Sequence, residues 1–104
     1  MAKYLLAYTG GATPETEAEQ QAVMAAWTDW LGEIGSAIAD PGNPFGPSKA
    51  VTNGGAVSDG GPSRLTGYSL VTSDSLDAAA ELAKGCPVLT NGGAVEVYET
   101  LDVM

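Results

Sequence analysis

The residues best suited to chemistry in this chain gather between Val57 and Thr72, in the sequence V-S-D-G-G-P-S-R-L-T-G-Y-S-L-V-T. A Gly-Pro loop carries one carboxylate, Asp59, and one of the four basic residues, Arg64, and it leads into a β-branched and aromatic segment containing Tyr68. Glycines allow a backbone to approach a ligand closely. We therefore predict a site here, in which Asp59 acts as base or anchor, Arg64 neutralises an anionic group and Tyr68 donates a hydrogen bond.

Two tryptophans, Trp27 and Trp30, lie three residues apart in a segment with helical periodicity, and we expect them to form the apolar wall of this site. Each candidate also has a purely structural interpretation. Asp59 could bond to the backbone of a turn at Gly60–Gly61, and Arg64 could form an ordinary surface ion pair. The aromatic side chains could simply be core residues. Both interpretations stay open at the level of the sequence.

The residue types that are missing narrow the chemistry. The chain has no histidine and a single cysteine, Cys86, which excludes a Ser-His-Asp triad, a Cys-His dyad and a zinc site of the usual His/Cys type within one chain. Acid-base work would fall to Asp, Glu, Tyr or Lys, and Asp59 is the best catalytic candidate. Cys86 follows a predicted helix C-terminus, where the dipole disfavours a thiolate, so we interpret it as structural. We predict no metal and no cofactor.

Composition and charge limit the partners. A chain of 104 residues fits one domain, spanning 1–104. The formal net charge is −9, and the four basic residues are scattered, so nucleic acid and anionic membranes are not expected as partners. The apolar run at 4–8 is too short for a signal peptide or a membrane span. One cysteine cannot form an intrachain disulfide and fits a reducing compartment, so we predict a cytoplasmic protein.

Hydrophobic periodicity predicts strands near 3–9, 48–58, 65–72 and 94–99, and helices near 14–35 and 75–84. The first helix begins either at Thr13–Pro14 or at a capping box formed by Thr16 and Glu19. Residues 35–47 contain three prolines and three glycines, too many for regular structure, so we expect this segment to be irregular. The order β-α-β-β-α-β predicts an α+β fold of the ferredoxin-like type with an antiparallel sheet.

The apolar pattern also bears on assembly. Two helices can cover only one face of a four-stranded sheet, yet the first, third and fourth predicted strands carry apolar residues on both faces. Uncovered apolar patches of this size usually mark interfaces. We therefore expect a two-fold homodimer in which two sheets pack face to face.

Several segments together resemble the YCII-related family, also called DGPF-domain proteins: K-Y-L-L-A-Y, W-T-D-W-L-G-E-I-G, V-S-D-G-G-P, L-T-G-Y-S-L-V, S-L-D-A-A-A-E-L-A-K-G-C-P and G-G-A-V-E-V-Y-E. The resemblance covers nearly the whole chain and implies a dimeric α+β barrel. Asp59 matches the aspartate of the family motif D-G-P-F, but here the motif becomes Asp59-Gly60-Gly61-Pro62 followed by Ser63. A His-Asp dyad proposed for some members does not carry over, because this chain has no histidine.

The family is largely of unknown activity, so three functions are weighed. We favour a homodimer that binds a small, apolar or weakly polar metabolite in a pocket beside the first helix and the 59–64 loop. The alternatives are a cofactor-free enzyme, similar to isomerases, lyases or monooxygenases and using Asp/Tyr acid-base chemistry, and a regulatory or interaction protein without a ligand. A pocket containing Asp59 would favour the first two, whereas a solid core with Asp59 in solvent would favour the third.

Overall fold

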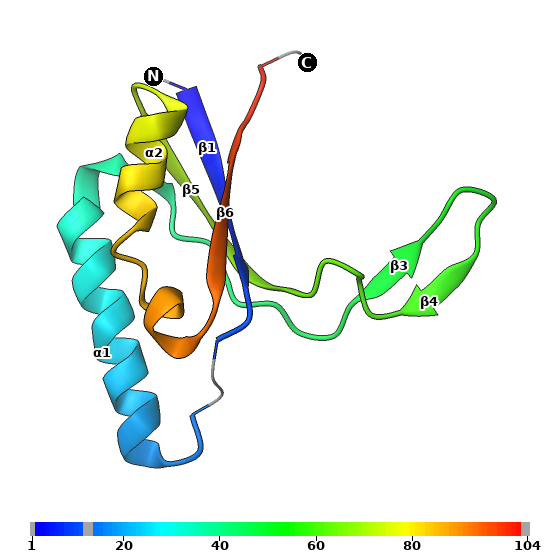
Figure 1. The fold of residues 1–104 in the computed structure, drawn as a ribbon, viewed down its shortest axis with the longest axis horizontal. Coiled ribbons are helices and arrows are strands. Elements are labelled where there is room, and N and C mark those ends of the chain that lie inside the picture. Colours follow the sequence, from blue (N-terminus) through cyan, green and yellow to red (C-terminus); the bar gives the residue numbers. More distant parts are fainter. Residues whose placement is uncertain (1, 12–13, 103–104) are drawn as a thin grey trace.

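The computed structural model describes residues 2–11 and 14–102 and shows an α+β fold (Figure 1). An antiparallel four-stranded sheet has the order β2-β5-β1-β6, which is the ferredoxin-like order predicted from the sequence. Its strands are β1 (Ala2–Thr9), β2 (Ile38–Asp40), β5 (Leu65–Ser73) and β6 (Ala94–Glu99). The helices are α1 (Glu17–Ile34) and α2 (Leu76–Ala83), with short 3-10 turns η1 (Gly35–Ala37) and η2 (Pro87–Asn91).

The helix starts follow capping chemistry. Thr16 is the N-cap of α1, and its hydroxyl accepts a hydrogen bond from the Glu19 N–H at 3.1 Å, while the Glu19 carboxylate accepts one from the Glu15 N–H at 3.0 Å. Of the two predicted starts the capping box is therefore confirmed; the alternative start includes Thr13, which lies outside the described residues. Ser75 caps α2 in the same way, accepting from the Ala78 N–H at 3.1 Å.

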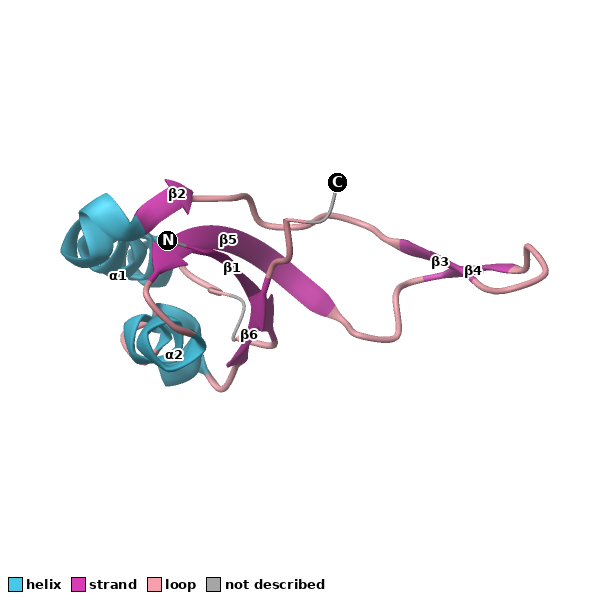
Figure 2. Cartoon of the chain, turned by 90° about the horizontal axis from the view of Figure 1, so that it is seen from above, coloured by secondary structure: helices cyan, strands magenta, loops and turns pink. Residues whose placement is uncertain are grey.

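The core lies between the sheet and the two helices, which Figure 2 shows on one side of the sheet. Alternate residues of β1 face the helices and are buried together with side chains from β5, α1 and α2: Tyr4, Leu6, Tyr8, Val71, Trp30, Ile34, Ala79 and Ala83. The Trp30 indole N–H donates to the Leu82 carbonyl at 3.1 Å, which ties α1 to α2. A Cβ at Gly85 would lie 2.9 Å from the Trp30 ring, so this close packing requires glycine.

The opposite side of the sheet, here called the open face, carries the other alternate residues: Leu5, Ala7, Tyr68, Leu70 and Tyr98. No helix of the described chain covers it (Figure 2). The Tyr68 ring stacks on Phe45 with 5.7 Å between centroids, and this is the one aromatic contact recorded there among the described residues. Tyr98 remains 52 % exposed. The structure thus has the two-faced apolar sheet expected from the sequence.

One element differs from the prediction. Residues 48–58 do not supply the second strand of the main sheet. They contribute to a separate two-stranded hairpin, β3 (Lys49–Val51) and β4 (Val57–Asp59), which extends away from the body (Figures 1 and 2). The second strand is β2, inside the segment expected to be irregular. It can pair with β5 because it ends at Asp40, before the first proline, and Ile38 lies opposite Val71.

Candidate functional site

A cavity of about 330 Å³ opens between the middle of α1 and one end of the sheet. We call it the Trp27 pocket. It is lined by residues of β1, α1, the loop after β2, the start of β5 and η2: Tyr8, Trp27, Leu31, Pro41, Gly42, Asn43, Pro44, Thr66, Gly67, Tyr68, Ser69 and Val88. None of these lining residues carries a formal charge. The pocket is therefore an apolar space with a few neutral polar groups, as is usual for small-molecule sites.

The wall formed by 41–44 depends on glycine. Gly42 has φ +76°, and a Cβ there would lie only 1.7 Å from the Tyr68 carbonyl oxygen. Its N–H donates to the Asp40 carboxylate at 2.9 Å, which holds the turn that follows β2. Gly67 on β5 also faces the pocket: a Cβ there would approach the Asn43 carbonyl oxygen at 3.2 Å and the Tyr8 ring at 3.5 Å. The two glycines thus let the loop pack against β5.

A chain of hydroxyl groups joins the pocket wall to this loop. Tyr8 Oη donates to Ser69 Oγ at 2.8 Å, and Ser69 Oγ donates to the Pro41 carbonyl oxygen at 2.7 Å. Burial raises the pKa of Tyr8 to about 12, although the Ser69 bond lowers it in part. Tyr8 therefore stays protonated at neutral pH. Its proton is held by Ser69, but its oxygen can still accept a hydrogen bond from a ligand.

The two tryptophans have different environments. Trp27 meets Tyr8 edge to face, with 5.1 Å between ring centroids and an interplanar angle of 71°, and it meets Trp30 in the same way at 5.7 Å and 79°. Trp30 is 3 % exposed, and its N–H is bonded within the core. Trp27 is only partly buried, and its indole N–H has no hydrogen-bond partner among the residues described. Trp27 thus forms the pocket wall, and Trp30 supports it from behind.

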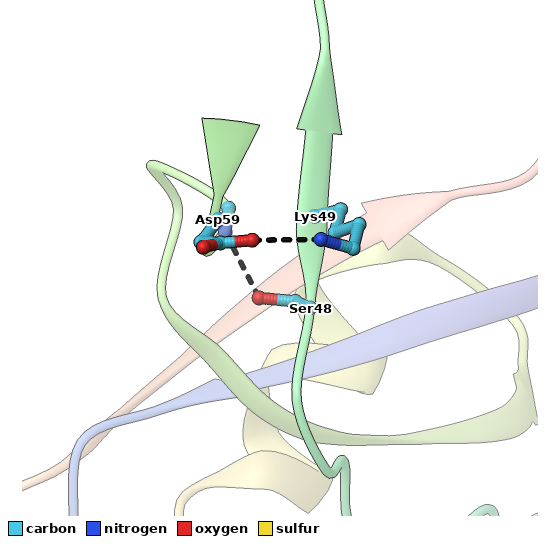
Figure 3. A network of polar contacts seen from close by, with 4 residues as sticks. Ser48, Lys49 and Asp59 are labelled. Atoms are coloured by element: carbon cyan, nitrogen blue, oxygen red, sulfur yellow. Dashed lines mark hydrogen bonds and ion pairs between the residues drawn. The ribbon is translucent and has the colours of Figure 1, made fainter. Parts of the chain in front are cut away.

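Asp59 and Arg64 lie elsewhere. Asp59 is the last residue of β4, its side chain is 92 % exposed, and it pairs with Lys49 at 2.7 Å across the hairpin (Figure 3). Arg64 is exposed in the loop that returns to β5, with φ +53°. Neither residue lines the Trp27 pocket, so Asp59, Arg64 and Tyr68 do not converge on one cavity within the described chain. That Asp59 and Arg64 contact a ligand stays a prediction.

Of the five predicted site residues, Trp27 and Tyr68 line the pocket, although the Tyr68 side chain lies on the open face, stacked on Phe45. Tyr8, Ser69 and the 41–44 loop also line the pocket, and the sequence analysis did not predict them as site residues. One signal was present: Gly67 interrupts a strand-like segment, and such glycines often mark a close backbone approach. In the structure Gly67 lies directly opposite Tyr8.

The described residues give no support for a metal site, a reactive thiol or a membrane span. Residues 2–11 and 14–102 contain no group of three or more His, Cys, Asp or Glu side chains able to hold a metal ion. Cys86 is 1 % exposed, and burial raises the pKa of its thiol to about 11 even though a backbone hydrogen bond at Val88 lowers it in part. Across the same ranges, neither helix has the length and apolar character needed to cross a bilayer.

Comparisons with known proteins agree with the fold. No family model matches the chain, and no curated protein matches it either. Among solved structures, the chain is similar to 5-chloro-2-hydroxyhydroquinone dehydrochlorinase, TftG, from Burkholderia phenoliruptrix AC1100, in complex with 2,5-dihydroxybenzoquinone. The TM-score is 0.58 at 17% sequence identity, over 95% of this chain and 93% of TftG. At this identity the likeness establishes the α+β barrel type of fold and no activity.

Proposed function

We propose that this chain is a small-molecule-binding protein of the YCII-related kind, which takes a compact, neutral, aromatic or weakly polar ligand in the Trp27 pocket. One observation carries the proposal: a cavity of about 330 Å³ is lined by aromatic and apolar side chains with no charged residue. Its volume falls within the range of small-molecule sites, about 300–1,000 Å³. The criterion set from the sequence gives a divided result for the interaction-protein alternative: the cavity is not what that alternative expects, whereas Asp59 lies in solvent as it expects.

The residues that line the pocket favour neutral, ring-shaped ligands over anionic ones. An anionic ligand would lose its hydration without gaining a cationic partner, which is costly in an apolar site. An aromatic ring could pack against Trp27 and Tyr8, and a ligand hydroxyl could donate to Tyr8 Oη. The TftG complex supports the ring shape alone, since its ligand, 2,5-dihydroxybenzoquinone, is a ring compound with acidic hydroxyl groups. We therefore expect phenol-like molecules to bind better than aromatic carboxylates of the same size.

The proposal includes a homodimer in the cytoplasm. The open face supports the dimer, because Leu5 and Leu70 lie beside a half-exposed Tyr98 with no helix over them in the described chain. The single thiol of Cys86, buried and unpaired, suits a reducing compartment. The YCII-related assignment rests on the sequence segments that resemble that family and on the shared fold type.

A cofactor-free enzyme is the second candidate, and the observation in its favour is that a protein of the same fold, TftG, is by name a dehydrochlorinase. The Trp27 pocket gives this candidate less support than it gives binding. No carboxylate is among the lining residues, and the raised pKa of Tyr8 keeps its hydroxyl protonated at neutral pH, so no strong base faces the cavity.

The experiment uses the two indole N–H groups as separate reporters in ¹H–¹⁵N correlation spectra. We titrate the chain with 4-hydroxybenzamide, which is neutral, and with 4-hydroxybenzoate, which is anionic and of nearly the same shape. The Trp27 indole signal should shift with saturation on adding the amide, because Trp27 lines the pocket, and the Trp30 signal should move less because Trp30 is buried behind it. The carboxylate should bind at least about tenfold more weakly.

Variants locate the site. Trp27→Phe assigns the indole signals and should weaken binding while leaving the Trp30 signal in place. Asp59→Asn and Arg64→Ala test the two predicted ligand contacts outside the pocket. If neither molecule shifts the Trp27 signal, or if the carboxylate binds more tightly than the amide, the proposed pocket chemistry is wrong. If Asp59→Asn weakens binding as much as Trp27→Phe does, the site extends to the hairpin.

A further inference from the structure

The β3–β4 hairpin and its flanks, residues 48–64, form a segment that we call the arm. In Figures 1 and 2 it extends well beyond the sheet and the helices. Its two strands have three residues each, and they pair only with one another in the described structure. An isolated two-stranded hairpin is marginally stable in water, even when its turn is favourable. Among the residues that the structure describes, the arm therefore lacks the packing that hairpins normally require.

The arm also presents apolar side chains outward. Val51 and Val57 lie directly opposite one another on the two strands, and they are 70% and 60% exposed. The Lys49–Asp59 pair lies on the same face of the hairpin, and both of its side chains are largely in solvent (Figure 3). Exposed ion pairs add little stability, so this pair does not replace the packing that the arm lacks. An exposed cross-strand pair of valines is more typical of an interface, in which another surface covers the two side chains.

The exposed area is large for a chain of this size. A monomer of 10.5 kDa ordinarily exposes about 5,400 Å². This chain exposes 7090 Å², an excess of about 1,700 Å². Its radius of gyration is 15.1 Å, against about 13 Å for a compact domain of this length. Burying the excess on two chains would give an interface of the size found in obligate homodimers, about 2,000–5,000 Å².

Charge indicates what covers the arm. Residues 48–64 contain two of the four basic residues and one of the thirteen acidic residues, so the arm has a formal charge of +1 and the rest of the chain has −10. Arg64 forms no ion pair with any described residue. A second copy of the chain offers an acidic body, with Glu96 on the open face beside Tyr98, and it carries the same exposed apolar residues. Arm and body are thus complementary in charge and in polarity.

We propose that the arm is a dimerisation element: the arm of each subunit packs on the body of a second copy of this chain and buries Val51 and Val57 there. The inference rests on the homodimer proposed above and adds a reciprocal contact to it, as two-fold symmetry requires. Two arms crossing between subunits account for the excess surface and give the hairpin the packing that it lacks among the described residues of its own chain.

The test compares two variants that add the same charge to opposite faces of the arm. Val51→Asp with Val57→Asp places facing acids on the apolar face, and Ala50→Asp with Ser58→Asp places them on the other face at the adjacent pair. Sedimentation equilibrium gives the dimer Kd of each variant and of the parent chain. We expect the valine variant to raise Kd at least about tenfold more than the control does, since two apolar side chains lose their burial.

Limited trypsin digestion gives a second readout that needs no variant. Lys49 and Arg64 lie near the two ends of the arm, so cleavage there should slow as the chain concentration rises through the dimer Kd. Equal Kd values for the two variants, or cleavage independent of concentration in a dimeric chain, would overturn the arm inference and leave the homodimer standing. A parent chain that stays monomeric at all concentrations would overturn both.

Discussion

The Tyr8–Ser69–Pro41 chain allows a quantitative prediction, because its two hydrogen bonds can be removed singly or together. Ser69 is 2 % exposed and Tyr8 is 5 % exposed, so the groups cannot exchange freely with bulk water. Tyr8→Phe removes one bond, at 2.8 Å, and leaves Ser69 donating to the Pro41 carbonyl. We expect this variant to lower the free energy of unfolding by about 1 kcal/mol, the usual net value of one hydrogen bond.

Ser69→Ala should cost more. It removes both bonds and leaves the Tyr8 hydroxyl buried without its acceptor, which costs about 2–3 kcal/mol. In the double variant that hydroxyl is gone, so only the loss of two ordinary bonds remains, at about 2 kcal/mol. The double variant should therefore be more stable than the sum of the single changes implies, by about 1–2 kcal/mol.

The assay is urea unfolding followed by tryptophan emission, at one fixed chain concentration because a dimer would make stability concentration-dependent. The slope of the free energy against urea should stay constant among the variants, which shows that the unfolded states are comparable. Two results would refute the reasoning: strict additivity in the double variant, or a Tyr8→Phe cost equal to that of Ser69→Ala. Either would mean that the hydroxyl groups do not act as one connected chain.

Two further predictions concern stability. Gly42→Ala should destabilise the chain by at least about 2 kcal/mol, because φ is +76° and its Cβ would overlap the backbone of β5; Gly46→Ala, whose Cβ would meet nothing within 4 Å, is the control and should be near neutral by the same urea assay. Stability should also fall at high pH. Burial raises the pKa of Cys86 from 9.0 to about 11 and that of Tyr8 from 10.0 to about 12, so the folded state holds these protons more tightly than the unfolded state does. Their contribution is present below pH 9 and is lost progressively toward pH 12, up to about 2–3 kcal/mol for each group. Cys86→Ala should remove the part of this loss that lies between pH 9 and 11; an unchanged pH profile would contradict the assignment.

The sequence predicted the fold well wherever the signal was local. Residues 94–99 form a strand because they alternate, with Val95 and Val97 toward the helices, and Ser75 caps its helix within a single turn. The second strand was misplaced, because β2 has only three residues and becomes a strand by pairing with β5, about thirty residues away in the chain. The hairpin at 48–58 satisfied strand propensity equally well but has no neighbour in the main sheet.

The candidate site was predicted only in part, because some of its residues come together through the order of the strands and not through local sequence. Trp27 and Tyr68 stand out by type, since large aromatics are few in this chain, and they do line the pocket. Asp59 and Arg64 are predicted as site residues because they flank a glycine-rich loop that leads into the strand containing Tyr68. The hairpin carries Asp59 away from the body, and the pocket is completed by Tyr8 and the 41–44 loop. Which segments close a cavity depends on sheet order, and this information is not contained in any single stretch of sequence.

The position of Cys86 gives the protein a built-in reporter of core opening. It is the only thiol in the chain, it is buried in the core, and its raised pKa keeps it protonated well above neutral pH. A thiol reagent can therefore alkylate Cys86 in the native protein only when the region around α2 and η2 separates from the sheet. The alkylation rate divided by that of the unfolded chain would give the fraction of time spent open, without any label or engineered residue. A ligand or partner that stabilises the closed core would slow the alkylation of Cys86 and could be detected in this way.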